Sequence, residues 1–158
     1  MTLALLLAML AAQPEEPPAP PPVERTADYH NRQFLYLYTL SPAEGWRQTA
    51  SGLRYRKLSG SGTGLHPRVT DTVTIHYAGR FIDGTEFDSS IARGEPATFP
   101  LARLIRGWQE GVPLMGVGDR YEFAIPYTLA YGPAGRGPIP GGATLVFTIE
   151  LIAIAPGS

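Results

Sequence analysis

Few side chains in this sequence have the types and spacing that covalent or metal-assisted chemistry requires. The three histidines, His30, His66 and His76, are isolated from one another and from any HxxxH or ExxH spacing, and cysteine is absent. We interpret His76 as a solvated side chain on the outward face of a strand. No GxSxG, P-loop or GxGxxG pattern and no pair of catalytic carboxylates can be found. The sequence therefore predicts a protein that works without a metal, a cofactor or a nucleophile.

Aromatic side chains next to loops are the more informative feature. They are Tyr77, Phe81, Phe87, Phe99, Trp108, Tyr131 and Phe147. Taken singly, aromatic residues belong to a core more often than to a site. However, Phe87 is followed by Asp88-Ser89-Ser90, and Tyr131 lies in the Gly/Pro-dense stretch AYGPAGRGPIPGG. Ordering such a loop costs conformational entropy, which shifts the balance toward a functional role.

Strands and one helix must position these side chains. Alternating apolar and polar residues predict strands over 51–58, 69–81, 120–125 and 144–151. Between them, Leu104, Ile105, Trp108, Val112 and Met115 recur at helical spacing. Glycine and proline make this a poor free helix, so it needs a sheet over its apolar face. The predicted fold class is α+β, an antiparallel twisted β-sheet wrapped over one short α-helix.

A short amphipathic helix is expected before the sheet. From Asp28 to Leu40 the pattern places Phe34, Leu35 and Tyr38, together with Leu37, on one broad face. Ser41-Pro42 ends this helix. We interpret it as a small helical lead-in to the domain.

Composition limits both the architecture and the partners. The 158 residues include 18 Gly and 16 Pro, which excludes a helical bundle, and they suffice for one domain of about 100 to 150 residues. With 13 Lys and Arg against 14 Asp and Glu, the formal net charge is −1. No overall basic field therefore recruits nucleic acid, and any partner must be recognised by a local site.

The start of the chain is interpreted as an export signal. Residues 1–12 are almost wholly apolar but too few to span a membrane, which is typical of a signal peptide. We expect a Pro-rich linker over 13–26, the helical lead-in over 27–50 and the main domain over 51–156. The protein would then be exported, to the periplasm, with no membrane span in the mature chain. The alternative is a mis-assigned start codon or a disordered tail, in which case the protein is cytoplasmic.

Four motifs in the domain carry a family resemblance. The runs VTIHYAGRFIDGTEFDSS, LIRGWQEGVPLMGVGDRYEFAIP, LAYGPAGRGPIP and ATLVFTIEL, in this order, resemble the FKBP-type peptidyl-prolyl cis-trans isomerases. The match covers about Ser51 to Ala153. The lead-in NRQFL and the run TASGLRYRKL also resemble bacterial exported members.

The resemblance implies an isomerase of peptide bonds that precede proline, with no cofactor and no metal, assisting the folding of exported proteins. It implies the catalytic residues Tyr77, Phe87, Asp88, Trp108, Tyr131 and Phe147, and the substrate-binding residues Leu104, Ile105, Phe99, Ile139 and Arg136. Trp108 would form the floor of the pocket. The Tyr131 hydroxyl and the Ile105 backbone N–H would bond substrate carbonyls. Asp88 would orient Tyr77 or polarise the twisted amide, or else it caps a turn through Ser89 and Ser90.

Two departures from the family pattern bear on what binds. The loop after Tyr131 is one residue shorter than the commonest pattern, and Ala97 replaces an aromatic residue at the groove edge, with Arg103 just before Leu104. Affinity for macrolides of the tacrolimus type is therefore expected to be weaker. The expected partners are proline-containing peptides and unfolded protein clients, and the expected state is a monomer. The alternative function is a proline-binding chaperone or scaffold module with little turnover.

Overall fold

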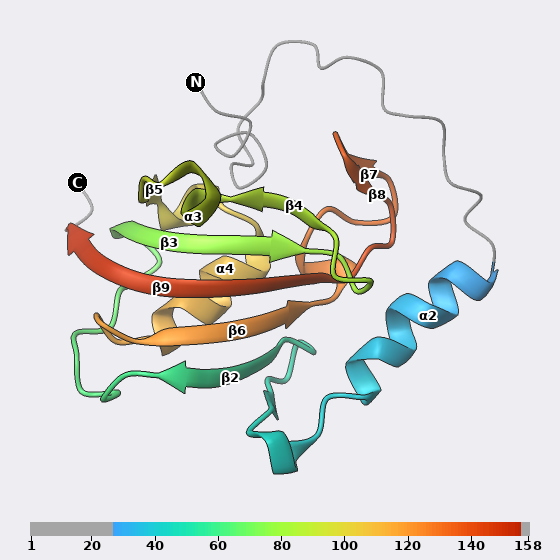
Figure 1. The fold of residues 1–158 in the computed structure, drawn as a ribbon, viewed down its shortest axis with the longest axis horizontal. Helices are drawn as coiled ribbons and strands as arrows, with labels where there is room; N and C mark the ends of the chain where they lie inside the picture. The colour runs from blue at the N-terminus through green and yellow to red at the C-terminus, as the bar shows by residue number, and fades with distance from the viewer. Residues whose placement is uncertain (1–26, 156–158) are drawn as a thin grey trace.

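The computed structural model describes residues 27–155, and its main feature is an antiparallel sheet (Figure 1). The sheet has seven strands in the order β1-β2-β6-β9-β3-β4, and β5 also pairs with β3. These strands are β1 (Arg47–Gln48), β2 (Arg54–Ser59), β3 (Thr72–Arg80), β4 (Glu86–Ser89), β5 (Ala97–Pro100), β6 (Arg120–Ile125) and β9 (Leu145–Ala155). A separate hairpin joins β7 (Gly135–Arg136) to β8 (Ile139–Pro140). Helix α4 (Arg106–Gly111) lies against one face of the sheet, so the predicted α+β class is confirmed.

Strand β3 shows how the alternating pattern builds the core. Val73, Ile75, Tyr77 and Gly79 are buried, while the residues between them are half-exposed. Strand β9 lies between β3 and β6, and its Phe147 is paired with Gly79 on one side and with Phe123 on the other. These three paired residues form a row across the sheet, in which Phe147 contacts Trp108 of α4 and Phe123 lies against Gly111 of α4.

Helix α4 is shorter than the predicted helical repeat. It ends at Gly111, and a 3₁₀ turn, η3 (Val112–Leu114), continues the chain because Pro113 has no N–H to extend an α-helix. A Cβ on Gly107 would lie 2.5 Å from a side-chain carbon of Ile125, and one on Gly111 would lie 2.6 Å from a ring carbon of Phe123. The two glycines that weaken the free helix therefore let it approach β6 closely.

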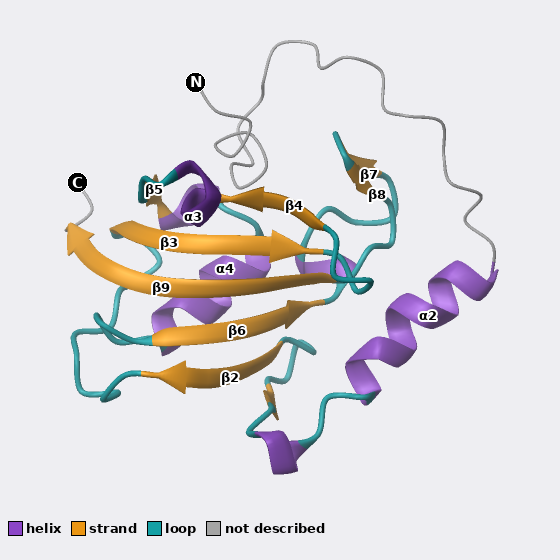
Figure 2. Cartoon of the chain, viewed as in Figure 1, coloured by secondary structure: helices purple, strands orange, loops and turns teal. Residues whose placement is uncertain are grey.

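The lead-in helix exists, but of the apolar face expected it buries only Leu37. Helix α2 (Ala27–Tyr38) buries Gln33 and Leu37, whereas Phe34, Leu35 and Tyr38 are 58, 58 and 65% exposed. Hydrophobic periodicity counts only apolar residues, so it could not anticipate that the helix docks through an amide side chain. Figure 2 shows α2 beside the sheet, near the end at which β9 begins.

Gln33 anchors α2 because it satisfies a buried backbone group. The backbone N–H of Thr144 donates to Gln33 Oε1 at 2.8 Å, and the Thr144 hydroxyl donates to the Gln33 carbonyl at 3.0 Å. Beside this anchor, Leu37 and Trp46 pack on Ala124 and Val146 from the outer face of the sheet. β6 and β9 are therefore covered on both faces near their shared end.

An ion triad continues this outer layer. Glu122 accepts from Arg56 at 2.9 Å and from Arg80 at 2.8 Å, and the Arg56 guanidinium lies 4.8 Å from the centre of the Trp46 ring. Burial, followed by the nearby Glu122 carboxylate, raises the pKa of the Tyr36 phenol on α2. The two arginines lower the same pKa to a smaller extent. The buried carboxylate is thus paired on both sides, as buried charges require.

The remaining elements are short. They are α3 (Ser90–Arg93) and the 3₁₀ turns η1 (Pro42–Glu44), η2 (Leu101–Arg103) and η4 (Tyr127–Leu129). Strands β4 and β5 were not anticipated, because each is only four residues long. The expected signal peptide and Pro-rich linker lie outside the described residues. Within residues 27–155 none of the helices has both the length and the apolar composition to cross a membrane.

Candidate active site

Trp108 lies at the centre of a cluster of aromatic rings. The indole projects from α4, is only 1% exposed, and contacts three rings edge-to-face. The ring centres lie 5.1 Å away at Phe147, 5.2 Å at Tyr77 and 6.2 Å at Phe99. These geometries suit aromatic quadrupoles and fix the indole plane. The Trp108 Nε1–H is buried and has no hydrogen-bond partner among residues 27–155.

A second group of rings extends the cluster toward the surface. Phe87 on β4 meets Phe147 edge-to-face at 5.6 Å and Phe81 at 4.9 Å, and it is only partly buried. The approach of these rings depends on Gly79, where an added Cβ would lie 2.6 Å from Phe147 and 2.7 Å from Phe87. Gly79 is therefore a packing glycine, which holds open the space for two rings of the candidate site.

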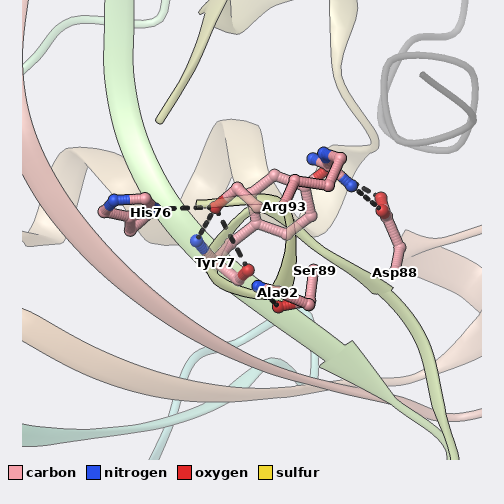
Figure 3. Close-up of polar contacts among 7 residues, drawn as sticks. His76, Tyr77, Asp88, Ser89, Ala92 and Arg93 are labelled. Atoms are coloured by element: carbon pink, nitrogen blue, oxygen red, sulfur yellow. Dashed lines mark hydrogen bonds and ion pairs between the residues drawn. The ribbon is translucent and has the colours of Figure 1, made fainter. Parts of the chain in front are cut away.

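The polar part of the cluster is a triad of the buried Tyr77 and Asp88 with the partly buried Arg93 (Figure 3). The Tyr77 hydroxyl donates to Asp88 Oδ2 at 2.6 Å, and Arg93 donates to Asp88 Oδ1 at 2.7 Å. Arg93 also donates to the Tyr77 hydroxyl oxygen at 3.2 Å. The Asp88 side chain is 4% exposed and that of Arg93 is 26% exposed, so the carboxylate is buried and neutralised by one partly exposed cation.

The triad keeps Tyr77 in its neutral form. Burial and then the hydrogen bond to Asp88 raise the pKa of the Tyr77 phenol well above its usual 10, and Arg93 offsets only part of this rise. The phenol is thus a donor to Asp88 at every physiological pH. Its ring, held at the hydroxyl by two partners, meets the Trp108 ring in an edge-to-face contact.

The turn that follows Asp88 is capped by Ser89, whereas Asp88 was the cap considered in the sequence analysis. Ser89 Oγ accepts the backbone N–H of Ala92 at 3.0 Å and is the N-cap of α3, so the structure assigns the cap to Ser89 and the triad contacts to Asp88. Ser90 Oγ accepts the backbone N–H of Tyr77 at 2.7 Å and lies 3.0 Å from His76 Nδ1. His76 therefore lies at a half-exposed, outward position of β3, as expected, and contacts Ser90 as well as solvent.

The other residues implied by the resemblance surround the cluster. Leu104, Ile105, Phe99 and Ile139 are buried in the same core as Trp108, and Tyr131 is packed against it. Arg136 lies on β7, paired with Ile139 across the hairpin. The structure thus brings the aromatic and aliphatic residues of the prediction into one core, and Arg136 is linked to it through its pairing with the buried Ile139.

Two residues of the site were missed by the sequence analysis. Arg93 follows Asp88 by five positions, across the Ser89 cap and the single turn of α3, and this spacing returns its side chain to the carboxylate. A Ser-capped turn ending in arginine is the signal that points to it. Gly79 stands inside an otherwise regular strand, where a glycine often marks close approach by another group.

Comparisons with known proteins agree with this geometry. Residues 64–152, more than half of the chain, match the family described as FKBP-type peptidyl-prolyl cis-trans isomerase. The chain is 53% identical over 119 residues to an FKBP-type peptidyl-prolyl cis-trans isomerase FkpA of Aeromonas hydrophila. It is 50% identical over 120 residues to the FKBP-type 22 kDa peptidyl-prolyl cis-trans isomerase of Escherichia coli. These matches cover 75% of this chain in each case, and 44% and 58% of the two relatives.

Solved structures show the same fold. The crystal structure of FkpA from Escherichia coli superposes with a TM-score of 0.79 at 39% identity, over 84% of this chain and 62% of the other. A peptidyl-prolyl cis-trans isomerase from Pseudomonas syringae superposes with a TM-score of 0.75 at 31% identity, over 82% and 96% of the two chains. The chain spans about half the length of these two curated relatives. By its sequence, its fold and its aromatic cluster, this chain belongs to the FKBP-type peptidyl-prolyl cis-trans isomerase family.

Proposed function

We propose that this protein accelerates the cis/trans interconversion of peptide bonds that precede proline, and that it assists the folding of exported proteins. The observation that carries the proposal is the ring cluster around Trp108, in which three other aromatic rings meet the indole edge-to-face. This arrangement is apolar, and the partly buried Phe87 and Tyr131 lie at its edge. It lies next to the Asp88 carboxylate, which Arg93 neutralises.

The chemistry of the reaction suits such a surface. Resonance gives the peptide bond a rotation barrier of about 18 to 20 kcal/mol, and no covalent bond has to break for rotation. In the twisted transition state the nitrogen lone pair leaves conjugation, so the amide is less polar than in the ground state. An apolar site therefore favours the twisted form over the planar form more than water does. Each ~1.4 kcal/mol of this difference gives a tenfold increase in rate.

The residues divide this work by position. Trp108 is the floor, and Tyr77, Phe87 and Phe147 enclose the proline ring, so they select proline by shape. The Tyr131 hydroxyl and the Ile105 backbone N–H bond substrate carbonyls and hold one side of the bond while the other rotates. Leu104, Phe99 and Ile139 supply further apolar wall, and Arg136 lies on the hairpin that flanks it.

The triad has a positioning role in this proposal. Asp88 and Arg93 hold the Tyr77 hydroxyl from two sides and thereby fix the angle of a ring that packs on Trp108. Because Arg93 neutralises Asp88 at 2.7 Å, the carboxylate exerts little net field on a bound amide. We therefore assign the contribution of Asp88 mainly to the orientation of Tyr77.

The decisive experiment measures isomerisation of a short proline peptide by the purified chain, with and without tacrolimus. Trp108→Leu is expected to lower kcat/KM by at least tenfold, while the exposed-surface variant Arg68→Leu leaves it unchanged. Fast turnover that tacrolimus inhibits supports the proposed site, and fast turnover that it does not inhibit points to the groove edge at Ala97. A folded chain without turnover would refute the enzyme assignment and favour a proline-binding module.

Location and partners follow from the same proposal. The expected clients are unfolded exported proteins that contain proline, and the expected state is a monomer. One relative, 48% identical over 105 residues, is named outer membrane protein MIP of Legionella longbeachae, which supports a role at the cell envelope. Mass spectrometry of envelope fractions tests export, because a cleaved chain would begin near Ala12 or Gln13.

A further inference from the structure

A groove away from the aromatic cluster lies between α2 and the outer part of the sheet. Its volume is about 610 Å³. Phe34, Leu37 and Tyr38 line it from α2, and Pro126 and Tyr127 line it at η4. Phe34, Tyr38 and Tyr127 are 58, 65 and 40% exposed, so three large apolar side chains gather at its rim. Large exposed apolar side chains that gather around one groove are typical of a binding surface.

Arg54 supplies the polar feature of this groove. It lies on β2, its guanidinium carbon is 5.6 Å from the centre of the Tyr38 ring, and its Nε–H is buried without an acceptor among residues 27–155. Arg56, two residues along the same strand, lies over the Trp46 ring and also pairs with the Glu122 carboxylate. Arg54 has the aromatic ring, but within the part of the chain that the structure describes its Nε–H lacks an acceptor of this kind. A guanidinium stacked on an aromatic ring keeps its edge free for a planar anion.

The charge of the groove favours an anionic group. None of the residues that line it is Asp or Glu, and Arg54 contributes a positive charge to the lining. Amide and hydroxyl side chains, including Gln48 and Thr128, lie along the same lining and can bond a backbone. A carboxylate with apolar neighbours would therefore pair with Arg54 while its neighbours cover Phe34 and Tyr127.

We infer that this groove binds an extended polypeptide segment in which a carboxylate side chain is flanked by apolar ones. The exposed rim favours a polypeptide, because small ligands occupy sites that bury most of their surface. The groove also shares a loop with the candidate active site. The Tyr127 carbonyl accepts the backbone N–H groups of Ala130 and Gly132, which flank Tyr131. The inference goes beyond the proposed function and stands independently of turnover.

The test uses the full chain and a proline-free peptide, Gly-Ser-Leu-Phe-Glu-Phe-Leu-Ser-Gly, carrying a neutral fluorophore. Fluorescence anisotropy should show saturable binding that excess tacrolimus does not displace. Arg54→Gln is expected to weaken binding about tenfold, the usual loss for one charge-assisted hydrogen bond. Lys57→Gln removes the same charge from an exposed position on the same strand and should leave binding unchanged. With glutamine in place of glutamate in the peptide, Arg54→Gln should have no further effect.

A second pair of variants tests the apolar part. Phe34 and Leu35 are equally exposed on α2, but only Phe34 lines the groove. Phe34→Ser should weaken both peptides several-fold, and Leu35→Ser should weaken neither, with isomerase activity and circular dichroism unchanged in both. The inference would be overturned if Arg54→Gln and Lys57→Gln weakened peptide binding equally, or if Phe34→Ser and Leu35→Ser did. Displacement of the peptide by tacrolimus would also overturn it, as would a sedimentation result in which wild type is a dimer and Phe34→Ser a monomer, since a second copy would then fill the groove.

Discussion

Removal of Arg93 should expose how much the buried Asp88 carboxylate depends on its partner. In Arg93→Leu, the 4% exposed Asp88 side chain keeps only the hydrogen bond from Tyr77. Breaking a buried ion pair from one side costs about 3 to 5 kcal/mol. Because the Arg93 side chain is 26% exposed and water can partly replace it, we expect about 2 kcal/mol here. For a domain of this size, that loss lowers Tm by roughly 7 °C.

The double variant Asp88→Asn/Arg93→Leu isolates the cause. An amide needs no counter-ion, so the loss caused by Arg93→Leu should be at least halved when Asp88→Asn is already present. Urea unfolding at pH 7 measures the four free energies of the cycle, and Arg68→Leu controls for removal of an exposed arginine. If Arg93→Leu costs the same with Asp88 and with Asn at that position, the reasoning from an uncompensated buried charge is wrong.

Three further perturbations test other parts of the structure. Gly79→Ala places a Cβ within 2.7 Å of Phe87 and Phe147, so we expect a loss of about 1 to 3 kcal/mol in urea unfolding and lower kcat/KM, with the far-UV spectrum unchanged. Folding raises the pKa of Tyr77, so the unfolded chain loses this proton first and the free energy of unfolding falls as pH rises above 10. In Tyr77→Phe the free energy of unfolding should therefore fall less steeply between pH 9 and 11. Equal slopes for the variant and the wild type would contradict the assignment. Gln33→Ala leaves the Thr144 N–H without its acceptor and should cost about 1 to 2 kcal/mol in thermal unfolding, whereas the exposed Asn31→Ala should cost little.

The sheet could be predicted because its strands alternate in a way that the chain itself records. β3, β6 and β9 bury one set of side chains against α4, and a period of two identifies that set without knowledge of partners. The alternating pattern predicts that Glu122 and Ala124 face outward, yet both are buried, because α2 and Trp46 cover the outer face of the sheet at that end. Such a second layer depends on a segment far away in sequence, which periodicity within one strand cannot reveal.

The site could be predicted in its aromatic part and less well in its polar part. Rings next to loops stand out in composition, and the motif resemblance proposed a role for each of them except Phe81. The contact between Asp88 and Arg93 depends instead on the local geometry of α3, where a serine cap turns the chain back on itself. The docking of α2 through Gln33 was hidden for a related reason, since the need for that amide comes from a backbone N–H more than a hundred positions away.

The dual position of Trp108, Tyr77 and Phe147, in the core of the domain and beneath the proposed substrate, limits how this scaffold can be re-engineered. A substitution at the floor would change substrate fit and unfold part of the population at the same time, because all three side chains are almost fully buried. Phe87, Ala97 and Arg136 are only partly buried, so they can vary with little loss of folded protein. A randomised library selected for new sequence preference should therefore yield its survivors at the rim and return the original residues at the floor.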